Sequence, residues 1–218
     1  MRACVVSEGG GTESDGRPKP GRASASMAHM SITLYFAPGT RATRIAFLLE
    51  ELGVPWERVT LDLARREHKT PAYLALNPNG VVPTLKDGDT VIFESVAIAL
   101  HLADRFAEKG LAPPPDSPLR GPYLSWMVWS MTTLEPPIGD VYSERLKPAE
   151  QQSAAAMAAA MERFGASAKV LEGELTGPYL LGDAFSAADV MVGCVLAFAD
   201  MLGMLEGHQG LRDYVARI

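Results

Sequence analysis

Cysteine and cationic charge are both scarce in this chain of 218 residues. Its two cysteines, Cys4 and Cys194, are separated by nearly the whole sequence, so we expect no disulfide and a reducing, cytoplasmic setting. Lys and Arg number 20 against 26 Asp and Glu, which gives a net charge of −6. Nucleic acid is therefore not an expected partner, because binding it requires a basic surface.

The apolar run at residues 190–199 is bracketed by Asp189 and Asp200, and it is too short to span a bilayer. We expect a buried core helix there and no membrane partner. Residues 1–30 contain no Ile, Leu, Phe, Tyr or Trp and are rich in Gly, Ser and Pro. With nothing to bury, this segment is predicted to be a disordered N-terminal extension, and Met27 or Met30 would be the original start.

Strand and helix patterns alternate over residues 31–107, the first predicted domain. Ile32, Leu34 and Phe36 alternate as in a strand, and apolar residues then recur at helical spacing until Gly53. Further along we expect a strand at 56–63, a short helix begun by Thr70 and Pro71, strands at 81–85 and 91–93 joined by a turn at Asp87 and Gly88, and a helix at 95–106. This order predicts an α/β domain in which a crossover unit precedes an antiparallel strand pair.

Residues 108–118 contain three consecutive prolines at 113–115, which cannot continue a helix, and we assign this segment as the linker between domains. Residues 119–218 are predicted to form an all-helical domain, with helices at 119–134, 148–175, 186–205 and 210–218. Ser186 and Asp189 have the spacing of a capping box at the start of the third helix. The sequence stops inside the last helix, so this domain is expected to be naturally short or truncated.

The segment from Glu67 to Ile98 contains the parts needed to hold a short anionic peptide. His68 and Lys69 form a basic pair. Val82 precedes Pro83, and a cis bond there would leave the N–H and C=O of Val82 facing outward. Ser95 is placed to cap the following helix, whose N-terminus would attract a carboxylate. Each feature also has a plain structural interpretation, as solvated surface, turn or simple cap, and their order along the chain is what favours a site.

This arrangement resembles the glutathione-binding half of the glutathione transferase family, in particular its plant phi and related bacterial members. The shared pattern is His-Lys, then Asn-Pro-x-Gly-x-Val-Pro-x-Leu, Asp-Gly-Asp and Glu-Ser-x-Ala-Ile, and it continues downstream at residues 182–190. The resemblance implies a thioredoxin-like domain (βαβαββα) followed by a helical bundle. It also implies a homodimer that activates the glutathione thiol as a thiolate to attack a small hydrophobic electrophile in detoxification, without a metal.

The resemblance further implies a role for each matching residue in binding glutathione. His68 and Lys69 would meet the glycyl carboxylate, and Val82 would exchange backbone hydrogen bonds with the cysteinyl unit while Pro83 shapes that edge. The γ-glutamyl end would be bound by Glu94 and Ser95. Val81 stands where many relatives have a polar residue, so one side-chain contact is absent.

A thiol with a pKa near ~8.5 needs a hydrogen-bond donor to favour its thiolate at neutral pH. Thr40 stands where phi members carry the serine donor, although it could also simply cap the first helix. Tyr35, at the end of the first strand, corresponds to the tyrosine donor of other classes, and Arg41 is a third alternative. The turn at residues 37–44 contains no cysteine, which argues against a thiol-disulfide mechanism.

Aromatic and Met side chains of the helical domain are the candidates for lining an electrophile pocket, although a stripe of this kind is more often ordinary core. These candidates are Tyr123, Trp126, Met127, Met131 and Met201. A second hypothesis from a different class is a binding or interaction module that keeps the fold and has weak or no catalysis.

Overall fold

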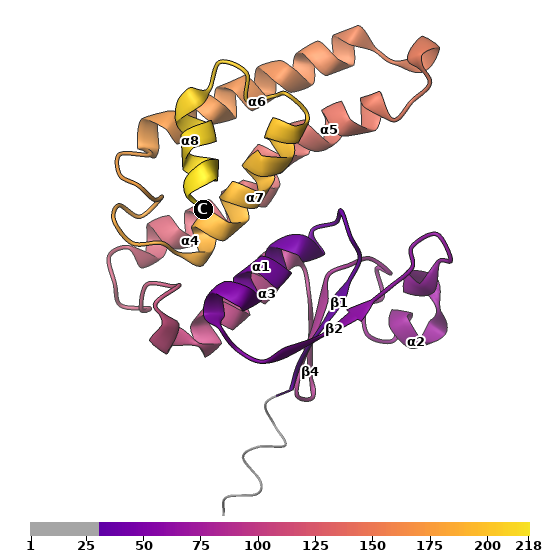
Figure 1. Cartoon of the computed structure of the whole chain (residues 1–218), viewed down its shortest axis with the longest axis vertical. Coiled ribbons are helices and arrows are strands. Elements are labelled where there is room, and N and C mark those ends of the chain that lie inside the picture. Colours follow the sequence, from indigo (N-terminus) through magenta and orange to yellow (C-terminus); the bar gives the residue numbers. More distant parts are fainter. Residues whose placement is uncertain (1–30) are drawn as a thin grey trace, which may run out of the picture.

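The computed structural model describes residues 31–218, and the predicted disordered extension at 1–30, together with Cys4, lies outside this range. The first half follows the predicted order of strands and helices, and Figure 1 shows it below the helical half. In chain order its elements are β1 (Ile32–Phe36), α1 (Ala42–Leu52), β2 (Trp56–Thr60), η2 (Glu67–Lys69), α2 (Pro71–Leu74), β3 (Thr84–Asp87), β4 (Thr90–Phe93), α3 (Ser95–Arg105) and η3 (Ala107–Lys109).

The four strands form one mixed sheet in the order β2-β1-β3-β4, in which β1 and β2 are parallel and the other pairs are antiparallel. Tyr35 is paired with Val59 on one side and with Thr84 on the other, and Thr84 is paired in turn with Phe93. This register confirms the predicted thioredoxin-like layout. It also brings the ends of β1, β2 and β4 and the start of β3 to the same edge of the sheet.

The two faces of the sheet are covered differently. Ile32 and Leu34 point from β1 into the core and are at most 2% exposed, on the side covered by α1 and α3. Figure 1 shows α1 and α3 between the sheet and the helical half, where α7 (Ala187–Met201) packs against both. Tyr35 alternates to the opposite face, where its ring meets Tyr73 of α2. The core is therefore continuous from the sheet into the helical half.

Two predicted strands differ from the observed strands by a few residues at one end. The strand expected at 81–85 begins only at Thr84, because the Val81 carbonyl is bonded by side chains rather than by a neighbouring strand and Pro83 has no N–H. The strand expected at 56–63 ends at Thr60, and Val59 within it is 37% exposed. Gly53 ends α1 as predicted, with φ of 61°.

The helical half begins after a stretch without helix or strand between Lys109 and Arg120, which overlaps the predicted linker. The division into domains at these residues stays a prediction. The elements of this half are α4 (Arg120–Trp129), the π-helical segment η4 (Ser130–Leu134), α5 (Glu135–Arg145), η5 (Ala149–Gln151), α6 (Ala154–Glu174), α7 (Ala187–Met201) and α8 (Gln209–Arg217).

The helix predicted to stop at Leu134 was assigned too short, because η4 leads directly into α5. Pro136 and Pro137 resemble a break in the sequence, but they lie at the start of α5, directly after the π-helical turn. In contrast, α6 starts later than predicted, after Ser153 accepts a hydrogen bond from the Ala156 N–H.

The capping box at the start of α7 is confirmed. The Ser186 N–H donates to Asp189 Oδ2 at 2.8 Å, and the other carboxylate oxygen accepts from Leu180 N–H and the Tyr214 hydroxyl. Asp189 is fully buried and ties α7 to its neighbouring loop and to α8. No helix within residues 31–218 is long and apolar enough to cross a membrane.

Candidate functional site

The sequence-predicted site residues gather at the sheet edge defined by the Val59, Tyr35, Thr84 and Phe93 row. The turn that contains Thr40 follows β1, Val82 precedes β3, and Glu94 and Ser95 follow β4. Because these strand ends are neighbours in the sheet, residues far apart in the sequence become neighbours at this edge. The segment that holds His68 and Lys69 lies between the end of β2 and α2, on the same side.

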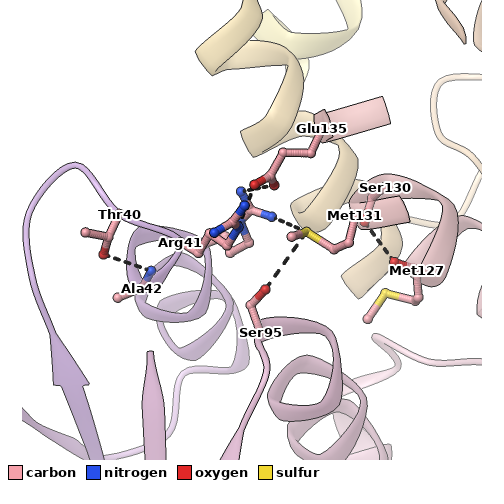
Figure 2. A network of polar contacts seen from close by, with 9 residues as sticks. Thr40, Arg41, Ala42, Ser95, Met127, Ser130, Met131 and Glu135 are labelled. Carbon is pink, nitrogen blue, oxygen red and sulfur yellow. Dashed lines mark hydrogen bonds and ion pairs between the residues drawn. The ribbon is translucent and has the colours of Figure 1, made fainter. Parts of the chain in front are cut away.

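Thr40 has its hydroxyl fully engaged within its own turn. Its Oγ1 donates to the Ala37 carbonyl at 2.7 Å and accepts from the Ala42 N–H at 3.2 Å, so it satisfies one free amide at the start of α1 (Figure 2). A hydroxyl has a single hydrogen to donate. Thr40 must therefore release Ala37 before it can donate to a ligand, and in this structure its hydroxyl bonds an amide at the start of α1, whose cap position is Arg41.

Tyr35 lies on the face of the sheet covered by α2. Its ring packs edge-on against Tyr73, with the ring centroids 5.6 Å apart. It lines a cavity of about 350 Å³ whose other walls include Leu61, Thr70 and Leu76. Thr40 does not line this cavity, so the two candidate donors have separate surroundings.

The cap of helix α3 is Glu94, one residue before the predicted cap Ser95. Ser95 is its first helical residue, and Glu94 occupies the cap position without a side-chain hydrogen bond, which corrects the assignment of Ser95 as the cap. The reason is the backbone of Glu94, whose φ of 72° turns the chain from β4 directly into the helix. Ser95 is 3% exposed, and its Oγ lies 4.0 Å from the Met131 sulfur (Figure 2).

Two arginines at the start of α1 converge on one carboxylate of the helical half. Arg41 Nε lies 2.5 Å from Glu135 Oε1, and Arg44 Nη2 lies 2.9 Å from Glu135 Oε2, off the line of a hydrogen bond (Figure 2). Arg44 Nη1 also donates to the Met131 sulfur at 2.6 Å. Two guanidinium groups against one carboxylate leave a net positive charge next to Thr40, to which the N-terminal end of α1 adds its dipole.

Glu135 was missed as a site residue in the sequence, whereas Met131 was a candidate for the electrophile pocket and contacts Arg44 and Ser95 instead. Both belong to the continuous helix that includes the π-helical turn, and such turns occur often at functional sites. No local sequence signal connects Arg41 with Glu135, which is 94 residues away.

The two residues of the basic pair, His68 and Lys69, differ in burial and in hydrogen bonding. His68 is half-buried, and its Nδ1 is buried without a hydrogen-bond partner among residues 31–218. Lys69 is exposed, and its Nζ donates to the Asn79 carbonyl at 3.2 Å. A Cβ added to Gly80 would lie 2.8 Å from Lys69 Nζ, so the Lys69 side chain crosses directly over this glycine.

The Val82–Pro83 peptide bond is cis, which confirms the predicted isomer. Pro83 is buried and Val82 half-buried, next to the exposed Val81.

The electrophile-lining candidates of the helical half are mostly not accessible. Tyr123 and Met127 are fully buried in the common core, which corrects their assignment as pocket lining in favour of the core alternative. Burial raises the pKa of Tyr123 well above its usual value, and Asp104 adds to this effect. Trp126 is half-buried against Trp129, whereas Met201 is 83% exposed, and only Met131 reaches the neighbourhood of Ser95.

An open space near the site lies beside Ala37 and Pro38, in the turn after β1. It is a cavity of about 630 Å³ between the end of β1 and the segment after β2. Its lining residues are Ala37, Pro38, Thr60, Leu61, Asp62, Leu63, Arg65 and Glu67. No sequence motif indicates this cavity, although its walls directly follow two predicted strands. Within residues 31–218 no cluster of three or more His, Cys, Asp or Glu residues is arranged to hold a metal ion.

Comparison with known proteins matches both halves of the chain. The family model described as glutathione S-transferase, N-terminal domain, matches residues 30–104, and the model described as glutathione S-transferase, C-terminal domain, matches residues 154–217. The chain is 34% identical to glutathione S-transferase PARB of Nicotiana tabacum over 167 residues, which cover 74% of this chain and 78% of PARB. It is 32% identical to glutathione S-transferase GstB of Escherichia coli K12, with 70% and 75% covered.

Among solved structures, a glutathione transferase homologue from Sulfitobacter with bound glutathione superimposes with a TM-score of 0.72. It is 29% identical in sequence, and the match covers 87% of this chain and 92% of the homologue.

Proposed function

The chain belongs to the glutathione S-transferase family, and from this membership we propose that it binds glutathione at the sheet edge and transfers it to a small electrophile. The observation that carries the proposal is the register of the sheet, which makes the Thr40 turn, Val82 and Ser95 neighbours. The Sulfitobacter homologue, which was solved with bound glutathione, has the same fold and supports the choice of ligand.

Each end of glutathione has matching groups in this arrangement. The glycyl carboxylate meets His68 and Lys69, and the γ-glutamyl carboxylate meets the Ser95 hydroxyl and the free amides at the start of α3. Glu94 is exposed and can pair with the γ-glutamyl ammonium. The cysteinyl unit then lies along Val82, which directs its thiol toward the turn after β1.

Thr40 is the proposed donor to the thiolate. Its hydroxyl transfers its hydrogen bond from the Ala37 carbonyl to the sulfur, and the Arg41 and Arg44 pair supplies positive charge that stabilises the anion. The thiolate then attacks the electrophilic carbon, the new S–C bond forms, and the leaving group departs with the bonding electrons. Tyr35 is the alternative donor.

The cavity beside Ala37 and Pro38 is the accessible space next to this thiol position. Its volume of about 630 Å³ falls in the range of small-molecule sites. Leu61 and Leu63 give it an apolar wall, and Asp62, Arg65 and Glu67 give it polar groups. This lining favours a small, partly apolar electrophile.

A second candidate function is a binding module without catalysis in the same fold. The engagement of Thr40 Oγ1 by Ala37 and Ala42 favours it, because a hydroxyl that only caps α1 activates no thiol. In both cases we expect a cytoplasmic homodimer that associates through the first half of one subunit and the helices of the other.

Steady-state turnover of glutathione with an aryl halide acceptor tests the catalytic proposal. Thr40→Ala should lower kcat about tenfold to a hundredfold through loss of a hydrogen bond to a charged group, whereas Thr40→Ser and Tyr35→Phe should retain turnover. A loss in Tyr35→Phe alone would transfer the role to Tyr35. If the wild type binds glutathione but turns over no acceptor, the binding module is the correct function.

A further inference from the structure

Two buried polar side chains donate to the carbonyl of Val81, the residue before Val82, and a third side chain joins these two donors. The Tyr73 hydroxyl donates to Val81 O at 2.6 Å, and Asn77 Nδ2 donates to the same oxygen at 2.9 Å. Thr84 Oγ1 joins the two donors, since it lies 2.7 Å from the Tyr73 hydroxyl and 3.1 Å from Asn77 Nδ2. A carbonyl oxygen has two lone pairs, so the Val81 oxygen is saturated.

The hydrogens of this network can be placed without ambiguity. The Asn79 N–H donates to Asn77 Oδ1 at 3.1 Å, so the Asn77 amide nitrogen must face Val81 and Thr84. The single hydroxyl hydrogen of Tyr73 goes to Val81 O, and Thr84 therefore donates to the Tyr73 oxygen. Each donor hydrogen makes one bond, so the hydrogens of the network have a single arrangement.

Water cannot replace a lost member of this network easily. Asn77 and Thr84 are 0% exposed and Tyr73 is 4% exposed. Burial raises the pKa of Tyr73, so its hydroxyl stays protonated as a donor.

The network fixes the direction of the N–H of Val82. In a planar trans peptide the carbonyl oxygen and the following N–H point in opposite directions. With the Val81 oxygen held against α2 and the start of β3, the Val82 N–H must point away from them, toward the surface. Within residues 31–218 this N–H donates to no protein atom, so it is available to a ligand.

We propose that Tyr73 is a positioning residue for glutathione, because its hydroxyl holds the Val81 carbonyl and thereby aims the Val82 N–H at the cysteinyl unit. This proposal rests on the proposed function of the site. Tyr73 does not touch the ligand and acts only through the backbone of residues 81 and 82. A phenylalanine would fill the same space between Tyr35 and the start of β3 but would leave the carbonyl with one donor.

Tyr73→Phe in the full chain tests the proposal with two readouts. Without ligand, amide hydrogen exchange of the peptide covering residues 80–85 should become faster, because the loop loses one of its two restraints. In calorimetry and kinetics, the Kd and KM for glutathione should rise about five- to tenfold while kcat stays unchanged, since the lost interaction acts equally in the ground and transition states.

Two control variants separate positioning from a general loss of stability. Thr84→Val removes a buried hydroxyl of the same network but leaves both donors to Val81, so it should lower the melting temperature with less than about a twofold change in Kd. Tyr142→Phe removes a hydroxyl from an exposed tyrosine of α5 and should change neither readout.

Unchanged exchange in Tyr73→Phe, or faster exchange with unchanged glutathione affinity, would overturn the proposal. An equal loss of affinity in Thr84→Val would also overturn it, because the effect would then follow stability. If the wild type does not bind glutathione, the proposed function fails, and the exchange comparison still decides whether Tyr73 holds this loop.

Discussion

Arg44 of α1 and Glu135 of α5 form a buried ion pair between the two halves of the molecule, with Nη2 and Oε2 2.9 Å apart. Their side chains are only 8% and 10% exposed. Arg41, whose side chain is 57% exposed, shares the same carboxylate. Glu135 therefore pairs with two cations directly beside the turn that carries the proposed thiol donor.

Replacing Glu135 by Gln should destabilise the protein strongly, because it leaves the Arg44 guanidinium buried without a counter-charge. We expect the free energy of unfolding in urea to fall by about 2–3 kcal/mol. Asp140→Asn is the matched control on the same helix, since its pairing with Arg163 is more than half exposed and should contribute less than about 1 kcal/mol. Equal losses of unfolding free energy in the two variants would show that the buried Arg44–Glu135 pair stabilises the protein no more than an exposed pair does.

Gly80→Ala should weaken glutathione binding through Lys69. Gly80 has a φ of 58°, and a new Cβ would lie 2.8 Å from Lys69 Nζ and 2.9 Å from Leu74 Cδ2, so the Lys69 side chain must move. Gly110→Ala is the control, because its φ is 74° but its Cβ would meet nothing within 4 Å.

Both glycine variants should lose about 1 kcal/mol of stability from the left-handed backbone. Only Gly80→Ala should also raise the calorimetric Kd for glutathione. If the Kd rises equally in both variants, Lys69 does not contribute to glutathione binding, and backbone strain explains the change.

The proposed homodimer places exposed apolar side chains of β4 and α4 in an interface. Phe93 is 39% exposed, and Leu124 and Val128, one helical turn apart on α4, are 37% and 50% exposed. Light scattering should give twice the chain mass of 23.4 kDa for the wild type and a monomer for Val128→Asp. Val170→Asp, at a similarly exposed valine of α6, should remain a dimer. A monomeric wild type, or a dimer that tolerates Val128→Asp, would contradict this interface.

Features that depend on neighbouring residues could be predicted from the sequence. The capping box of Ser186 and Asp189, the end of α1 at Gly53 and the order of strands and helices all follow from local spacing, and all were found. The positions of Val82 and Ser95 at one sheet edge then follow from the order of the strands.

Features that depend on packing could not be predicted. The periodic apolar residues of α4 look the same whether they line a cavity or fill a core, and the structure buries Tyr123 and Met127 completely. The contact of Arg44 with Glu135 depends on how the fold brings α1 against α5. This helix was not predicted, because its first turn contains two prolines. The ring of hydrogen bonds around Val81 likewise depends on the exact approach of α2 to β3 and has no sequence motif.

Calorimetric titration of glutathione into the full chain tests the central claim most directly. We predict saturable binding to the wild type and to Ser125→Ala, which removes an exposed hydroxyl of α4 that donates to the Gly121 carbonyl. In Ser95→Ala the affinity should fall about tenfold to a hundredfold, as expected for a lost hydrogen bond to a carboxylate. Absence of binding to the wild type at millimolar glutathione, or an unchanged affinity in Ser95→Ala, would contradict the account of this site.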